Sequence, residues 1–295
     1  MSAAVPVTSG GLVVVDKPGG MTSHDVVARI RRLAGTRKVG HAGTLDPMAT
    51  GVLLVGVERS TRLLGHLSLT EKAYDATVRL GAATTTDDAG GELLHGSSAA
   101  HLTDQSVREA ARGFVGDIEQ RPSAVSAIKV DGKRSYARVR DGEQVDLPPR
   151  PVTVHELRVG GLRVSGEHVD VDVHVRCSSG TYIRAIARDL GAALGVGGHL
   201  TALRRTAVGP FTLAESHTLE SLSDTFEVVD ISVVARRCFA SYDLDEAQAR
   251  DVGYGRRLEV GLGAHGPVSV FDPSGRFLAL YEQRGEVAAP VAVFV

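Results

Sequence analysis

The stretch at residues 40–54, GHAGTLDPMATGVLL, places one carboxylate, Asp46, in a loop directly before an apolar segment. Pro47 fixes its own φ angle and pushes Asp46 toward an extended backbone. Gly43 and Gly51 allow tight turns and the close approach of a ligand. The pattern predicts a rigid loop that holds Asp46 in place. An isolated Asp-Pro pair would indicate only a turn whose carboxylate caps local N–H groups.

Length and composition indicate a globular protein. The chain has 295 residues, of which 43% are hydrophobic, and this is enough for one large domain and a second small one. No window reaches the ~18 to 20 consecutive apolar residues of a membrane helix, and the start MSAAVPVTSG lacks the features of a signal peptide. We therefore expect a cytoplasmic protein without membrane contact.

Motifs for metals and cofactors are missing from the sequence. Cys177 and Cys238 form no CxxC pair, histidine forms no HExxH, and neither GxGxxG nor a GxxxxGK[ST] phosphate loop occurs. The segment TTTDDAGG at 84–91 resembles a calcium loop only weakly, because its spacing is wrong and no Glu closes it. We expect a turn there, no metal, no cofactor and no structural disulfide.

Charge gives two opposing indications about nucleic acid. The formal net charge of −2 argues against a strongly basic RNA-binding chain. Basic residues nevertheless gather in two segments, which are Arg31, Arg32, Arg37 and Lys38, and Lys129, Lys133, Arg134, Arg138 and Arg140. Such clusters either neutralise RNA phosphates or form an ordinary solvated face.

Apolar periodicity predicts alternating strands and helices before residue 235. Period-two or continuous apolar runs predict strands at 11–15, 52–57, 74–80 and 169–177. Helical spacing predicts helices from the N-cap Ser23 to Gly35, at 103–114 and from about Tyr182 to Gly195. The segment between the second helix and residue 169 is expected to be a long polar, basic connection.

The sequence changes character near residue 240. A short helix at 245–251 precedes glycine-rich turns, a hairpin formed by PVSVF, DPSG and RFLALY, and a last strand in VAAPVAVFV. We therefore expect a mixed α+β fold with a large domain at 1–235 and a small β-rich module at 240–295.

Several ordered motifs carry a resemblance to a known family. GHAGTLDPMATG, VVVDKPGGMTS, CSSGTYIRAIARDLG and LRRTAVG resemble motifs of the bacterial tRNA pseudouridine synthases of the TruB group, and the resemblance covers nearly the whole chain. It implies a catalytic domain built on a mixed, mainly antiparallel central sheet flanked by helices, followed by a PUA-like RNA-binding module. It also implies isomerisation of uridine 55 in the T loop of tRNA, by base flipping and without a cofactor. Because the chain lacks long basic extensions that would recruit partner proteins, we expect it to act without a guide RNA. We expect a monomer.

The same resemblance assigns roles to individual residues. Asp46 is implied to be the catalytic carboxylate, and Arg184 is implied to pair with it. The residues implied to contact substrate or to support the RNA-facing edge are Lys17, His41, Tyr74, Lys129, Tyr182, Arg184 and Leu203. Taken singly, Tyr74 and Leu203 would be packed core residues, and His41 would be a polar loop residue.

The implied reaction explains why these residue types are needed. Isomerisation breaks the N-glycosidic bond, turns the uracil and joins its C5 to the ribose, so it needs a carboxylate, a stacking surface and donors for a negatively charged base. Two other functions fit the same residues. One is a non-catalytic tRNA-binding or tRNA-folding protein, and the other is a hydrolase that releases free uracil.

Two positions depart from the family pattern. Val125 stands where family members often have Tyr, and Thr85 replaces an Asp in the turn at 84–91. Because neither is the nucleophile, we expect these changes to affect local RNA contacts and loop order rather than activity.

Overall fold

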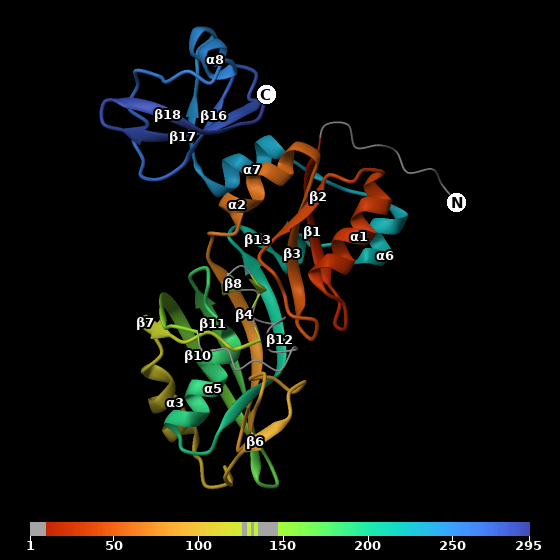
Figure 1. Ribbon diagram of the computed structural model, residues 1–295, viewed down its shortest axis with the longest axis vertical. Coiled ribbons are helices and arrows are strands. Elements are labelled where there is room, and N and C mark those ends of the chain that lie inside the picture. The colour runs from red at the N-terminus through yellow and green to blue at the C-terminus, as the bar shows by residue number, and fades with distance from the viewer. Residues whose placement is uncertain (1–9, 126–128, 131–132, 135–146) are drawn as a thin grey trace.

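The computed structural model describes residues 10–125, 129–130, 133–134 and 147–295. A large sheet crosses the molecule in the order β14-β1-β3-β12-β4-β11-β10-β7, with β2 on β3 and β13 on β12 (Figure 1). In chain order these strands are β1 (Gly11–Lys17), β2 (Val39–Ala42), β3 (Thr50–Val57), β4 (Lys72–Leu80), β7 (Gly116–Gln120), β10 (Arg150–Ser165), β11 (His168–Cys177), β12 (Gly198–Val208), β13 (Phe211–Thr212) and β14 (Val229–Asp230). Among the described strands of this sheet, only β3 and β12 pair in parallel. The prediction of a mixed, mainly antiparallel sheet is confirmed.

Helices cover two separate parts of the sheet. α1 (Ser23–Ala34) and α6 (Leu219–Asp224) lie side by side next to β1, whereas α5 (Ile183–Ala193) and α3 (Asp104–Arg112) lie over the part formed by β12 and β10 (Figure 1). The 3₁₀ helix η1 (Glu58–Leu63) and α2 (Leu64–Leu67) connect β3 to β4, and η2 (Leu213–Glu215) follows β13. Two small hairpins, β5 (Ala83–Thr84) with β6 (Leu93–His95) and β8 (Lys129–Val130) with β9 (Lys133–Arg134), form separate two-stranded sheets.

Local sequence explains most of these elements. In β11, valines at alternate positions are buried, as period-two alternation requires. α1 ends at Gly35, whose φ of 64° is the left-handed conformation that glycine tolerates. The prediction of Ser23 as the N-cap is wrong. Thr22 caps α1 in a capping box with Asp25, and Ser23 is a buried first-turn residue.

Two long strands lie where the sequence predicted none. β10 occupies part of the expected polar connection, and β12 lies between β3 and β4 at the centre of the sheet. β12 carries LTALRR, in which two arginines interrupt the apolar pattern that would have predicted a central strand. Of the helices in the described residues, none is both long and apolar enough to span a membrane.

The C-terminal part forms its own small sheet. β15 (Ala240–Asp243), β16 (Val268–Phe271), β17 (Phe277–Arg284) and β18 (Val287–Val293) pair in that order, with α8 (Glu246–Gly253) beside them (Figure 1). α7 (Ile231–Cys238) precedes this sheet and packs in a buried cluster with Leu12, Leu63 and Phe277. The cluster joins the two sheets through apolar contacts.

Candidate active site

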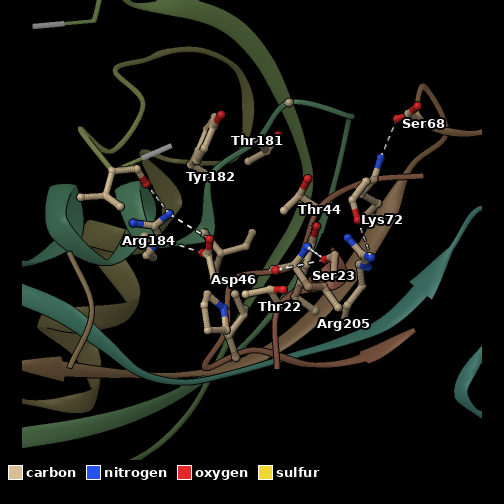
Figure 2. A pocket seen from close by; sticks show the side chains of 18 of the residues that line it. Thr22, Ser23, Thr44, Asp46, Ser68, Lys72, Thr181, Tyr182, Arg184 and Arg205 are labelled. Atoms are coloured by element: carbon tan, nitrogen blue, oxygen red, sulfur yellow. Dashed lines mark hydrogen bonds and ion pairs between the residues drawn. The ribbon is translucent and has the colours of Figure 1, made fainter. Parts of the chain in front are cut away.

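Asp46 lies at the edge of a cavity of about 580 Å³. The cavity is lined by the loop that carries Asp46, the start of α1, β4, β12 and the start of α5 (Figure 2). The side chain of Asp46 is 34% exposed. Its carboxylate can therefore meet a ligand that enters from solvent, and a pocket of this size suits a small organic group.

Arg184 binds Asp46 with two hydrogen bonds. Nε donates to Oδ2 at 2.9 Å and Nη2 donates to Oδ1 at 3.2 Å (Figure 2). The planar guanidinium fixes the orientation of the carboxylate while retaining its own charge. Arg184 lies in the first turn of α5, where the helix dipole disfavours a cation, so its partner explains its position. The implied pairing of Asp46 with Arg184 is confirmed.

Arg184 is itself held by backbone carbonyls. Its side chain is 4% exposed, Nη1 donates to the carbonyl of Thr86, and Nη2 donates to the carbonyl of Val125, both at 2.8 Å. Asp88 lies 3.8 Å from Arg184 Nε. The prediction of a turn at 84–91 is confirmed by the hydrogen bond from Gly91 N to Asp88 O. Sequence reasoning missed that this turn supports the arginine of the site.

The departures from the family pattern lie close to this arginine. Val125 contributes a backbone carbonyl, which any residue at that position can supply. Thr85 accepts a hydrogen bond at Oγ1 from Glu92 N at 3.0 Å and closes the turn. The expected effects of both departures on RNA contacts stay predictions.

Two buried residues fix the backbone on either side of Asp46. Ser23 Oγ accepts from Leu45 N at 3.0 Å and donates to Leu45 O at 3.2 Å. Lys17 Nζ donates to the carbonyls of Met21 at 2.6 Å and Pro47 at 3.3 Å. Because both residues flanking Asp46 are bound, the backbone of the loop has little freedom, as the Gly/Pro pattern predicted.

Lys17 is placed behind the loop rather than on an RNA-facing surface. It is fully buried, and burial lowers the pKa of its ammonium to about 8. Asp46 opposes this shift through its negative charge. The geometry indicates that Lys17 positions the loop and stays out of reach of a large ligand.

Tyr74, Leu203 and Arg205 line the buried wall of the cavity. Tyr74 and Leu203 are 7% and 8% exposed, and burial raises the pKa of the Tyr74 phenol. Arg205 is 1% exposed and donates from Nε to Val52 O at 2.7 Å and from Nη2 to Gly43 O at 2.9 Å. Arg205 thus connects both ends of the Asp46 loop. Sequence reasoning missed it, although it lies two residues after Leu203.

Lys72 is a second functional candidate that sequence reasoning missed. It lines the cavity and is 7% exposed, and Nζ donates to the carbonyl of Ser68 at 2.9 Å (Figure 2). Nζ also donates to the carbonyl of Thr70 at 2.9 Å. Burial, with a smaller effect of the Arg205 charge, lowers the pKa of Lys72 to about 8. Its signal was available, since Lys72 precedes Tyr74 by two residues and alternation places both on one face of β4.

The remaining predicted residues lie at the rim or outside the cavity. Tyr182 lines the cavity and caps α5, and Gln120 Oε1 accepts from its backbone N at 2.8 Å. His41 lies on β2, and its ring packs edge-on against His24, which lines the cavity, with 5.4 Å between ring centroids.

The second basic cluster falls largely outside the described part of the chain. β8 and β9 include Lys129, Lys133 and Arg134, but the side chains of these residues are not described, and Arg138 and Arg140 lie outside the described residues. The role implied for Lys129 stays a prediction. In the first cluster, Arg31, Arg32, Arg37 and Lys38 are exposed. No group of three or more His, Cys, Asp or Glu that could hold a metal gathers within the described ranges.

Comparisons with known proteins give consistent family matches along the chain. TruB family pseudouridylate synthase (N terminal domain) matches residues 31–183, and tRNA pseudouridylate synthase B C-terminal domain matches 184–238. The description tRNA Pseudouridine synthase II, C terminal, matches 239–295. Together these matches extend from residue 31 to residue 295.

Individual relatives are similar in sequence to this chain over almost their full length. The chain is 57% identical over 288 residues to the tRNA pseudouridine synthase B of Thermobifida fusca (strain YX), covering 96% of this chain and 98% of the relative. It is 55% identical over 294 residues to that of Paenarthrobacter aurescens (strain TC1), covering 96% and 94%. Among solved structures, a Cbf5-Nop10-Gar1 complex contains a chain that is 26% identical with a TM-score of 0.75, covering 97% of this chain and 85% of that chain.

Proposed function

The chain belongs to the TruB family of pseudouridine synthases, enzymes that isomerise uridine in tRNA, and we propose that it acts on uridine 55 of the T loop with Asp46 as the catalytic carboxylate. The observation that carries this proposal is the bidentate pair of Asp46 with a buried arginine at the edge of the cavity. A partly exposed carboxylate in a fixed orientation suits attack on, or proton removal from, a bound nucleoside.

The cavity supplies the other groups that the reaction needs. We propose that the target uridine leaves its stack, as chemistry on a base requires, and enters with its ribose near Asp46. Tyr74 then stacks on the uracil, Leu203 packs on its edge, and Tyr182 covers it from the start of α5. His41, beside His24 at the rim, is placed to contact T-loop bases that remain outside.

We further propose that the protein recognises tRNA directly, as a cytoplasmic monomer and without a guide RNA. Residues 1–235 would form the catalytic domain, and 240–295 a PUA-like RNA-binding module. The separate C-terminal sheet with its own buried cluster supports the second assignment. The exposed arginines of α1 and the basic segment around Lys129 would contact phosphates, so binding should weaken as salt rises.

The test is tritium release from a tRNA transcript labelled at uridine C5, with the purified protein alone. We expect release by the parent protein and loss of release in Asp46→Asn, which keeps the size of the side chain but removes its charge. A transcript with cytidine at position 55 should give no release. Free uracil in the products would instead indicate a hydrolase.

Binding separates the remaining alternative. Asp46→Asn should still bind tRNA, because most of the affinity comes from phosphate contacts. If the parent protein binds tRNA but releases no tritium from it, the proposed activity is wrong and a tRNA-binding or tRNA-folding role is favoured.

A further inference from the structure

In the described part of the chain, two buried cations of the cavity wall lack a carboxylate partner. Within the described residues, Lys72 Nζ donates to backbone carbonyls, and the Arg205 guanidinium donates to backbone carbonyls and to the Tyr74 hydroxyl. Neither side chain forms an ion pair with a described carboxylate. Glu71, next to Lys72 in the chain, pairs instead with Arg176 and His155. Because an unpaired buried charge is unfavourable, its presence in a cavity indicates that something negative binds there.

The two cations lie close together, on one side of the cavity. A Cβ built on Gly43 would be 3.4 Å from both Lys72 Cε and Arg205 Nη1. Figure 2 shows Lys72 and Arg205 on the side of the cavity away from Arg184. Both side chains are more than nine-tenths buried, and we call Lys72 and Arg205 together the cationic floor.

The different exposure of Asp46 and Tyr74 sets the orientation of a substrate relative to the cationic floor. The Asp46 side chain is 34% exposed, whereas Tyr74 is 7% exposed and lies two residues from Lys72 on the same face of β4. A nucleoside whose ribose meets Asp46 therefore places its base inward, between Tyr74 and the cationic floor. The charge that the floor would meet is that of the uracil ring.

The uracil ring becomes negative during the reaction. When the C1′–N1 bond breaks, its electron pair passes to the ring and spreads over N1 and the carbonyl oxygens. C5 then joins C1′, the C5 proton leaves to a base, and N1 gains a proton, so no atom is lost. If Asp46 adds to the ring instead, the same oxygens receive the charge.

We propose that Lys72, supported by Arg205, binds a carbonyl oxygen of the flipped uracil and stabilises the negative charge on the ring as the glycosidic bond breaks. This inference rests on the proposed function. Lys72 remains an ammonium throughout and supplies charge rather than a proton. A fixed cation in a site that excludes water is well suited to this, because it needs no reorganisation during the reaction.

The neighbours of Lys72 are consistent with this role. Cys177 lies opposite Lys72 on β11, but burial raises the pKa of its thiol to about 11, so it is neutral and does not compensate the ammonium. Burial and Arg205 lower the pKa of Lys72 to about 8. Between this value and the ordinary 10.5 the unfolded chain binds more protons, so the free energy of unfolding rises with pH there. At neutral pH, the charged Lys72 therefore destabilises the fold.

The test compares Lys72→Met, which keeps the chain length without the charge, with Lys72→Arg, which keeps the charge. We expect Lys72→Met to lower the single-turnover rate of tritium release by roughly 10² to 10³-fold. Its dissociation constant for tRNA should stay within about twofold of the parent value, since phosphates dominate affinity. Its melting temperature should be unchanged or higher. Lys72→Arg should recover at least about tenfold of the lost rate.

A pH profile gives a second readout. As pH rises through about 8, the parent rate should fall as Lys72 loses its proton, and this fall should be reduced in Lys72→Arg. Lys17 titrates in the same range in both proteins, so the difference between the profiles reports Lys72.

Two results would overturn the inference while leaving the proposed function intact. One is an active parent protein whose rate of tritium release is unchanged by Lys72→Met. The other is a loss of rate that is fully explained by a lower melting temperature and a lower affinity for tRNA. A parent that releases no tritium from tRNA would overturn the proposed function and, with it, this inference.

Discussion

At the scale of single residues, the Asp46 loop is held in place by side chains that bind its backbone. Ser23, Lys17 and Arg205 each bind backbone carbonyls of this loop or of its ends. These contacts convert a short glycine-containing loop into a fixed support. A change of Ser23 or Lys17 should therefore affect the rate of reaction through the position of Asp46 rather than through the chemistry.

Gly51 provides a residue-scale prediction. Its φ is 99°, and a Cβ there would overlap the carbonyl oxygen of Arg205 on the paired strand β12. We expect Gly51→Ala to lower the free energy of unfolding by about 1 to 2 kcal/mol for the backbone conformation, and by a further 1 to 3 kcal/mol or so for the overlap. Urea unfolding measures the loss.

Gly275 is the matched control for Gly51. It also has a positive φ, of 84°, but an added Cβ would meet nothing within 4 Å. Gly275→Ala should therefore show only the backbone contribution of about 1 to 2 kcal/mol. Equal losses in the two variants would contradict the close approach of β3 to β12.

At the scale of elements, β4 carries residues of the site on one face and an ion pair with β11 on the other. Its inward positions include Tyr74 and Lys72, whereas Arg79 binds Asp170 on β11 through two hydrogen bonds of 2.8 Å. The register pairs Arg79 directly with Asp170. Cross-strand pairs of this kind stabilise the register on which the site depends.

The ion pair between Arg79 and Asp170 predicts a pH dependence of stability. Hydrogen bonds from Arg79 hold the pKa of Asp170 below its ordinary value of 3.8. Asp170 therefore adds stability above about pH 3.8, and this contribution is lost as pH falls through the lower, folded-state pKa. We expect Asp170→Asn to have a lower melting temperature than the parent protein at pH 7. The difference in melting temperature between the two proteins should become smaller at acid pH.

A double-mutant cycle tests the assignment to Arg79. Arg79→Met should remove the same pH-dependent contribution, and the double variant should lose little more than either single variant. Additive losses would show that Asp170 is stabilised by something other than Arg79.

At the scale of the whole molecule, one apolar cluster joins the C-terminal sheet to the large sheet. Phe277 is 3% exposed and packs with Phe271 and Phe294 at ring-centroid separations of 5.7 and 4.9 Å, in a cluster that also contains Leu12 and Leu63. Arg62 adds a hydrogen bond to Val293 O at 3.1 Å. A shared core of this kind should make the two parts unfold together.

Phe277→Ala is the corresponding prediction. We expect it to lower the free energy of unfolding by about 3 to 5 kcal/mol, as for other buried phenylalanines. Leu69→Ala is the control, because Leu69 is 72% exposed and should change stability by no more than about 0.5 kcal/mol.

Urea unfolding of the parent, followed by circular dichroism and by tyrosine fluorescence, should give one coincident transition. Two separate transitions in the parent protein would contradict the coupling of the two sheets.

The sequence by itself determined the elements whose signals are local. The alternating valines of β11, the helical spacing of α1 and α5, and the C-terminal hairpin are properties of neighbouring residues, and the structure contains each of them. The Gly/Pro loop around Asp46 was also readable, because φ preferences act within a few residues. Resemblance, rather than periodicity, supplied the partner of Asp46.

Only the tertiary structure decided which distant residues form the site. Arg184 lies 138 residues after Asp46, and Lys72 lies near Arg205 because β4 and β12 pair side by side. No local sequence pattern shows that such distant residues lie close together. The two arginines of β12 interrupted the apolar pattern that would have predicted a central strand. The burial that lowers the pKa of Lys72 arises from packing, since its surroundings come from strands far apart in the chain.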